Sequence, residues 1–300
     1  MSVDRTKTTL FLLVIVYFMD ILVFILENDD REAIAMFLST VFQSPPSILI
    51  TGMSLVNVVS MANAGYAEVT GNHMKYSKFW NHNSNLITNN NKVSSRYGML
   101  FIYTPSFLAG LASFWLFPDH NLRFLLLLSA LTFHFFKRIF EVIFIHKYSG
   151  GIMVDSGIVI SLSYLTSTSI MIYSQYLSQE LGEPLIDLKY LGIVLFLLGI
   201  TGNFYHHYLL SKLRKNDGDD EKDYKIPKGG LFDLVVCPHY LFEILGFVGI
   251  SFISQNLYAL SFATGVILYL MGRSYATRKW YLSKFQAFPK HVKAIFPYLL

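Results

Sequence analysis

The stretch Leu188-Lys-Tyr-Leu-Gly-Ile-Val-Leu-Phe-Leu-Leu-Gly-Ile-Thr-Gly-Asn-Phe-Tyr-His-His-Tyr-Leu-Leu210 decides the fold of this chain. A run of about 20 mostly apolar residues is long enough to cross the hydrocarbon core of a bilayer as a helix. Seven further apolar runs are found along the chain, at Thr8–Leu26, Ser47–Ala67, Gly98–Phe117, Leu122–Ile145, Ser156–Leu177, Leu231–Ile253 and Leu257–Met271. The sequence therefore predicts an all-α, polytopic membrane protein.

The composition supports this class. Hydrophobic residues make up 53% of the 300 residues and charged residues only 15%, whereas soluble domains carry about 25% charged residues. The single cysteine, Cys237, excludes an internal disulfide. The partners expected from this composition are the bilayer and its lipids, and not nucleic acid.

The charges orient the predicted bundle. If the spans alternate across the membrane, 19 of the 24 Lys and Arg residues fall on the side of the N-terminus and 3 on the other side. Lys137 and Arg138 lie within a span. Because cytoplasmic loops carry the excess of Lys and Arg, both termini are predicted to be cytosolic.

The first span differs from the others, since the polar segment Glu27-Asn-Asp-Asp-Arg-Glu32 separates it from the rest. We expect residues 1–45 to form an N-terminal extension with a signal-anchor or transmembrane helix. Residues 46–300 are expected to form the main membrane domain.

The fourth span carries a stripe of polar residues. His134, Lys137, Arg138 and Glu141 are spaced i, i+3, i+4 and i+7, which places them on one helical face. Snorkelling of Lys137 and Arg138 toward the surface is the plain alternative. Ionisable residues inside a membrane are costly and usually functional, so we favour a buried functional cluster.

The sixth span repeats the pattern with Asn203 and His207 on one face, beside Gly199 and Gly202. The glycines indicate either close helix packing or approach to a ligand. The adjacent His206 and His207 point about 100° apart on a helix and do not easily serve one ion. No metal site is predicted.

The seventh span opens with Tyr224-Lys-Ile-Pro-Lys-Gly-Gly-Leu-Phe-Asp-Leu-Val-Val-Cys-Pro-His-Tyr240, followed by Glu243. Taken alone, this segment is a turn that re-enters the membrane, and Tyr240 an ordinary core tyrosine. However, three spans place polar groups at the same cytosolic depth, and a phenol can donate a proton there. A site at this end of the bundle is therefore predicted.

The chain has no acidic residue after Glu243, and the Lys and Arg residues of this segment are Arg273, Arg278, Lys279, Lys284, Lys290 and Lys293. Attraction to anionic lipid headgroups explains such a tail. A pocket for a polyphosphate is the sharper interpretation, because guanidinium groups bind phosphate oxygens in a bidentate manner.

Together these motifs resemble the steroid 5α-reductase family, which includes trans-2-enoyl-CoA reductases. The matching pieces are His-x-x-Lys-Arg-x-x-Glu from His134, Gly202-Asn203, Leu213-Arg214, Tyr224-x-Ile-Pro-x-Gly-Gly-Leu-Phe, Cys-Pro-His-Tyr-x-x-Glu from Cys237, and Arg273. The resemblance implies a seven-helix transmembrane core, with the first span as an extra helix.

The resemblance also implies an activity. An enzyme of this family in the endoplasmic reticulum membrane would use NADPH to reduce a carbonyl-conjugated C=C bond of a lipid. The positions that match its cofactor contacts are Asn203, Arg214, Tyr224, Arg273 and Gly202. The positions that match its catalytic groups are Tyr240, Lys137, Arg138 and Glu141, with Tyr240 as the proton donor. Association with other lipid-synthesis enzymes is a further expectation.

Departures from the family pattern concern the substrate. Tyr103 stands where steroid reductases carry a glutamate that holds the steroid ketone, and His239 replaces a common asparagine. We expect Tyr103, His134 and His239 to face the substrate. Very-long-chain trans-2-enoyl-CoA reduction is therefore the main alternative. An isoprenylcysteine-type methyltransferase and a non-catalytic lipid-binding protein are the remaining alternatives.

Overall fold

The computed structural model describes residue 36 and residues 38–74, 91–118, 121–148, 150–213 and 224–297. The predicted span Thr8–Leu26, and with it most of the predicted extension 1–45, lies outside these residues.

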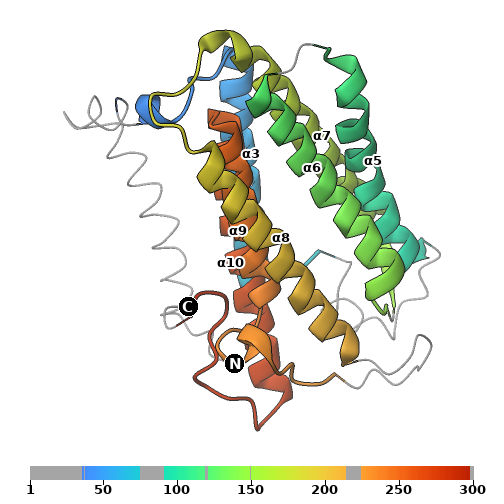
Figure 1. Ribbon diagram of the computed structural model, residues 1–300. Helices are drawn as coiled ribbons and strands as arrows, with labels where there is room; N and C mark the ends of the chain where they lie inside the picture. The colour runs from blue at the N-terminus through green and yellow to red at the C-terminus, as the bar shows by residue number, and fades with distance from the viewer. Residues whose placement is uncertain are drawn as a thin grey trace.

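Most of the described part of the chain is helical, and it contains seven α-helices that are each at least 17 residues long. They are α3 (Ile48–Thr70), α5 (Ser95–Leu116), α6 (Leu122–Phe140), α7 (Val154–Ser178), α8 (Lys189–Lys212), α9 (Pro238–Ser254) and α10 (Leu257–Lys284). A π-helical turn, Glu141–Ile145, extends α6. Figure 1 shows α5, α6 and α7 grouped together, with α8 crossing the bundle diagonally beside α9 and α10.

Among the described residues, five helical segments are long and apolar enough to cross a membrane: Ile48–Thr70, Ser95–Leu116, Val154–Leu181, Lys189–Lys212 and Leu257–Lys284. The prediction of a multi-helix membrane protein is confirmed at this level, and the predicted count of seven spans stays a prediction.

Two predicted boundaries were wrong. The seventh span begins at Pro238 and not at Leu231, because residues Gly230–Asp233 form a separate 3-10 turn. Gly229, just before this turn, and Gly230, its first residue, both have positive φ, which glycine adopts without strain. The last span does not end at Met271, since α10 continues to Lys284.

Glycines set the contact between α8 and α9. A Cβ atom at Gly199 would lie 2.3 Å from the backbone nitrogen of Gly246, and one at Gly249 would lie 2.4 Å from that of Phe196. Small residues of this kind allow helix backbones to approach closely where lipid supplies no hydrophobic driving force. This close contact fixes the α8 side chains relative to the start of α9.

The all-α prediction missed a short ribbon of two strands. β1 (Lys92–Ser94) and β2 (Gly151–Met153) pair in antiparallel register, with Val93 opposite Ile152. The ribbon joins the beginning of α5 to the beginning of α7. It lies at the same end of the bundle as Glu141, because α6 runs opposite to both helices.

Arg123 organises the opposite end of the bundle, although its side chain is only 1% exposed. Its guanidinium donates to Glu183 at 2.5 and 3.0 Å, to Asp187 at 2.8 Å and to the Ile253 carbonyl at 2.8 Å. The Oε1 atom of Gln255 accepts a further bond from Arg123. One side chain thus connects α6, the loop before α8 and the turn between α9 and α10.

The Asp187 carboxylate of this cluster stays charged well below neutral pH. Burial raises the pKa of the Asp187 carboxyl, but hydrogen bonds from Lys189 and Arg123 outweigh it and hold the pKa at about 2. Because the ordinary value is about 3.9, this carboxylate stabilises the fold at neutral pH. That contribution is lost as the pH falls from about 4 through the folded-state pKa of about 2.

We expect Arg123→Met to lower the stability of the protein in detergent by about 1–3 kcal/mol, since buried acceptors lose their donor. The exposed Glu183 and Asp187 carboxylates can hydrate, which limits the loss. Thermal unfolding monitored by circular dichroism measures the change. Lys279→Met, which removes a charge at an exposed position, should leave the unfolding midpoint nearly unchanged. Equal midpoints for the two variants would contradict the assigned role of Arg123.

Candidate active site

The site is centred on Glu141, where α6 passes into its π-helical turn. Its carboxylate is fully buried, with 0% exposure. Lys137 Nζ lies 2.7 Å from Oε1, and Arg138 Nη1 donates to Oε2 at 3.1 Å. The stripe predicted from spacing therefore holds an ion-paired group inside the bundle, and Lys137, at 7% exposure, does not snorkel to the surface.

The α8 helix completes this arrangement. Asn203 Oδ1 accepts a hydrogen bond from Lys137 Nζ, and Asn203 Nδ2 donates to the backbone carbonyl of His239 at 2.7 Å. His207 Nδ1 lies 2.9 Å from Glu141 Oε1. Since Glu141 already accepts two charged donors, the imidazole nitrogen is best assigned as a donor here.

Tyr103 on α5 contacts the Arg138 guanidinium at a different nitrogen from the one that faces Glu141. Arg138 Nη2 donates to the Tyr103 hydroxyl at 2.5 Å, and its guanidinium carbon lies 4.8 Å from the phenol ring centroid. We call Tyr103, Lys137, Arg138, Glu141, Asn203 and His207 the Glu141 network. It joins α5, α6 and α8 and reaches the start of α9 through the His239 carbonyl.

A second carboxylate acts on the same cations. Glu243, one turn after Tyr240, interacts electrostatically with both Lys137 and Arg138. The charges of two carboxylates, Glu141 and Glu243, thus act on the same two cations. Such preorganised charges respond strongly to new charge that develops beside them.

Tyr240 stands in the first turn of α9, where its N–H donates to the Cys237 carbonyl at 3.0 Å. Its ring lies 4.2 Å from that of His239, which in turn lies 5.4 Å from the ring of His207. The aromatic rings therefore form a continuous series from the Glu141 network to Tyr240. Tyr240 is half-buried and packs against the hydrophobic side chains of two apolar clusters.

His134 is buried one turn before the network. Its ring lies 4.8 Å from that of Phe247 on α9 and 5.1 Å from that of Phe135. The predicted role of His134 in substrate binding stays a prediction.

The predicted cofactor residues fall into separate places. Asn203 belongs to the network. Tyr224 packs edge-on against Trp280 at 4.9 Å, with Lys284 Nζ 5.5 Å from the Tyr224 ring. Arg273 Nη1 lies 2.7 Å from both carboxylate oxygens of Glu68 on α3.

The other two predicted cofactor positions give less information. Arg214 lies outside the described residues. Gly202 has a packing reason for being glycine, since a Cβ atom there would lie 2.3 Å from the Phe242 ring. Its predicted contact with a cofactor stays a prediction.

His206 is a fixed part of the fold near Gly202. The Leu231 N–H donates to His206 Nε2 at 3.1 Å, so that nitrogen carries no proton. His206 Nδ1 must then carry the proton that it shares with the Gly202 carbonyl at 2.7 Å. The ring is thus a neutral link that ties the Gly230–Asp233 turn to α8.

Glu141, His146 and His207 bring possible metal-ligand atoms to within 4.8 Å of one another. However, the Glu141 oxygens already face the ammonium of Lys137 and the guanidinium of Arg138 at 2.7 and 3.1 Å. Two positive charges at this distance repel a divalent cation. The donor set is better suited to proton transfer than to metal binding.

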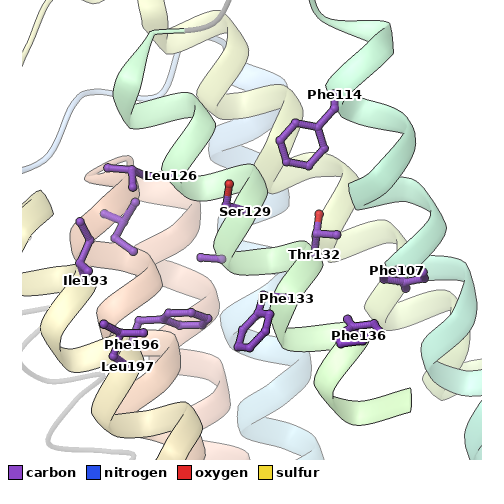
Figure 2. Close-up of a pocket in the computed structure, with 12 residues that line it drawn as sticks. Phe107, Phe114, Leu126, Ser129, Thr132, Phe133, Phe136, Ile193, Phe196 and Leu197 are labelled. Carbon is purple, nitrogen blue, oxygen red and sulfur yellow. The ribbon is translucent and has the colours of Figure 1, made fainter. Parts of the chain in front are cut away.

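An apolar groove lies between α5, α6 and α8, and Ile253 of α9 completes its lining (Figure 2). It has a volume of about 470 Å³. Phe133 and Phe136 line it from α6, Phe107 from α5 and Phe196 from α8. None of its lining residues belongs to the Glu141 network. Its lining suits a hydrocarbon chain and not a charged group.

Fold and site define a class: an α-helical membrane protein with a buried network of charges, phenols and imidazoles at one end of its bundle. Residues 157–300 match the family model described as 3-oxo-5-alpha-steroid 4-dehydrogenase. Three relatives are similar over longer stretches, as follows.

The very-long-chain enoyl-CoA reductase of Dictyostelium discoideum is 34% identical over 178 residues, which cover 58% of this chain and 57% of that protein. The steroid 5-alpha-reductase DET2 of Gossypium hirsutum is 31% identical over 201 residues, covering 62% and 76%. The probable very-long-chain enoyl-CoA reductase art-1 of Caenorhabditis elegans is 30% identical over 221 residues, covering 68% of each chain.

The chain belongs to the 3-oxo-5-alpha-steroid 4-dehydrogenase family, which confirms the resemblance found in the motifs. The aligned part spans between 57% and 76% of the length of these three relatives.

Proposed function

We propose that this protein is a membrane reductase that uses NADPH to reduce a carbonyl-conjugated C=C bond of a lipid, as a 3-oxo-5-alpha-steroid 4-dehydrogenase does. The observation that carries the proposal is the buried Glu141 network, which places two cations, a phenol and an amide within hydrogen-bonding reach of one another. Similarity to proteins named as steroid 5-alpha-reductases and enoyl-CoA reductases supports it.

The chemistry requires stabilisation of negative charge on oxygen. When a hydride reaches the β-carbon, charge develops on the carbonyl oxygen, and donors already in place there lower the barrier. We assign Tyr240 as the donor to that oxygen or to the α-carbon, with Tyr103 as the second phenol. Lys137 and Arg138 supply positive potential, and Glu141 fixes their geometry through its two ion pairs.

Side chains in two separate places, the network and the end of α10, suit a nicotinamide cofactor. NADPH supplies the hydride when it is bound. Asn203 offers an amide, while Tyr224, Trp280 and Lys284 form an aromatic and cationic surface at the end of α10. Planar bases stack on such rings and ammonium groups attract phosphates. We assign Asn203, Arg214, Tyr224, Arg273 and Gly202 to cofactor binding.

A very-long-chain trans-2-enoyl-CoA is the second candidate substrate. It is favoured by Tyr103, whose phenol accepts a hydrogen bond from Arg138 at 2.5 Å in place of the carboxylate of steroid-reducing relatives. A ketosteroid bound here would not find the carboxylate that holds the steroid ketone in those relatives, whereas a thioester substrate does not require this carboxylate. In either case we place the protein in the endoplasmic reticulum membrane with cytosolic termini, where it could associate with other lipid-synthesis enzymes.

Microsomes that contain the protein should oxidise NADPH when a Δ4-3-ketosteroid or a trans-2-enoyl-CoA is added. The loss of NADPH absorbance, compared with microsomes from cells carrying an empty vector, measures this activity. The substrate that gives the larger kcat/KM decides between the two candidates. Activity no greater than in the empty-vector membranes with either substrate would contradict the proposed function. Methyl transfer from S-adenosylmethionine would favour the methyltransferase alternative.

A further inference from the structure

A buried ion pair joins α3 to α10. Arg273 Nη1 donates to both carboxylate oxygens of Glu68 at 2.7 Å, and the two side chains are only 3% and 2% exposed. Ionisable residues within membrane spans are costly and usually functional. Arg273 is assigned to cofactor binding, whereas Glu68 has no assigned role. The function of the Glu68 carboxylate is therefore to be sought in its effect on Arg273.

The two helices do not depend on this ion pair for their contact. A Cβ atom at Gly272 would lie 2.2 Å from the Gly65 carbonyl oxygen, and one at Gly65 would lie 2.6 Å from the Leu268 carbonyl oxygen. The helix backbones thus meet directly beside the pair. A buried ion pair often adds no stability over apolar side chains of similar volume. Helix packing alone does not account for Glu68.

Glu68 also occupies an unfavourable position on its own helix. It lies in the last turn of α3, which ends at Thr70, where the negative end of the helix dipole repels a carboxylate. The half-buried His73 meets the same carboxylate, with Nδ1 2.6 Å from Oε2. Because a carboxylate only accepts, the imidazole nitrogen is the donor. Glu68 therefore keeps a partner when Arg273 turns to another anion.

Arg273 shares a face of α10 with the aromatic and cationic surface at the end of that helix. Trp280 and Lys284 follow it at i+7 and i+11, positions that return to the same helical face. Both contact the Tyr224 ring, Trp280 at 4.9 Å and Lys284 at 5.5 Å. Seven residues of helix separate Arg273 from Trp280 by roughly 10 Å. A base stacked at Trp280 leaves the diphosphate of the same dinucleotide within reach of Arg273.

Carboxylates and phosphates accept hydrogen bonds from the same guanidinium donors. We propose that the Glu68 carboxylate competes with the cofactor diphosphate for Arg273 and so limits how tightly the cofactor is held. This inference rests on the proposed function. Arg273 transfers the Nη1 hydrogen bonds from Glu68 to a phosphate oxygen, while Glu68 keeps the bond from His73. Glu68 is thus a positioning residue, and its competition favours release of the spent cofactor after each turnover.

The test measures cofactor affinity, because competition and structural support predict opposite signs. We expect Glu68→Gln to lower the dissociation constant of NADPH roughly 5- to 150-fold, the usual range for coupling between two binding events. KM for NADPH should fall with it, while KM for the lipid substrate stays the same. Titration of the full-length protein in detergent, followed by tryptophan fluorescence, gives the dissociation constant without turnover. A purely structural role would weaken NADPH binding or leave it unchanged.

Unfolding in detergent provides a second measurement. Glu68→Gln leaves Arg273 buried without its carboxylate, so the unfolding midpoint should fall, and NADPH should raise it by more than in the wild-type protein. Glu68→Asp keeps the charge and shortens the side chain, so it should tighten NADPH binding by less. This variant tests the competition even where Glu68→Gln fails to fold. The exposed Glu180→Gln should match the wild-type protein in both measurements.

Two further comparisons locate the effect. In an Arg273→Met background, Glu68→Gln should leave NADPH affinity unchanged, because the group that it acts through is gone. NADH has the diphosphate but no 2′-phosphate, so Glu68→Gln should tighten NADH binding by the same factor. Tightening of NADPH alone overturns the choice of the diphosphate.

The competition and the proposed function fail in different ways. Unchanged or weaker NADPH binding in both Glu68 variants overturns the competition alone, and so does an effect of Glu68→Gln that survives Arg273→Met. A wild-type protein that neither binds nor oxidises NADPH overturns the proposed function and the competition together.

Discussion

Tyr240→Phe is expected to lower kcat by roughly 10²- to 10⁴-fold, the contribution typical of a general acid. The substitution removes one hydroxyl and keeps the ring that packs against His239 at 4.2 Å and against the apolar clusters around it. Because the bound substrate keeps its other contacts, KM should change far less than kcat. Steady-state NADPH oxidation in microsomes, with the better of the two substrates, measures both constants.

The matched control is Tyr173→Phe, which makes the same change at a position of α7 that is 51% exposed. It should retain wild-type kcat. A Tyr240→Phe protein with a kcat within a factor of two of wild type would exclude Tyr240 as the proton donor. The role would then pass to Tyr103, whose hydroxyl accepts the hydrogen bond from Arg138.

Glu141→Gln is expected to reduce both activity and stability. Glutamine keeps the shape of the side chain but removes the charge that pairs with Lys137 at 2.7 Å and Arg138 at 3.1 Å. Breaking a buried ion pair by neutralising one partner costs about 3–5 kcal/mol, because the remaining charge stays buried without compensation. We expect a lower unfolding midpoint in detergent and no measurable turnover.

Glu180→Gln makes the same substitution at an exposed residue of the 3-10 turn Gln179–Leu181. Glu180→Gln should change neither the turnover nor the unfolding midpoint. If Glu141→Gln unfolds at the wild-type temperature, the Glu141 carboxylate is not the partner that stabilises Lys137 and Arg138. Glu243, which acts on the same two cations, would then be the next carboxylate to test.

Much of the site could be predicted from spacing. His134, Lys137, Arg138 and Glu141 share a helical face by period alone, and the structure brings the last three together. Asn203 was predicted through its match to the family motif, and it contacts both Lys137 and the His239 carbonyl. Tyr103 is noticeable in the sequence as a departure from the family pattern, and its hydroxyl accepts a hydrogen bond from Arg138.

Other features could not be predicted in this way. His207 was visible on the face of Asn203, but only the packing of α8 beside α6 shows that it meets Glu141. His146 lies five residues after Glu141, off the α-helical period, so only the π-helical turn explains their proximity. The contact of Arg273 with Glu68 joins residues 205 positions apart, and no local sequence pattern predicts it.

The sequence by itself determined the membrane class, most of the helices and the polar stripe, because hydropathy and helical period are local properties of neighbouring residues. The tertiary structure decided which stripes face one another, since that depends on the side chains that fit between helices. The close contact of Gly199 with Gly246 shows this dependence, because it fixes where α8 meets α9 and hence where Asn203 reaches the carbonyl beside Tyr240.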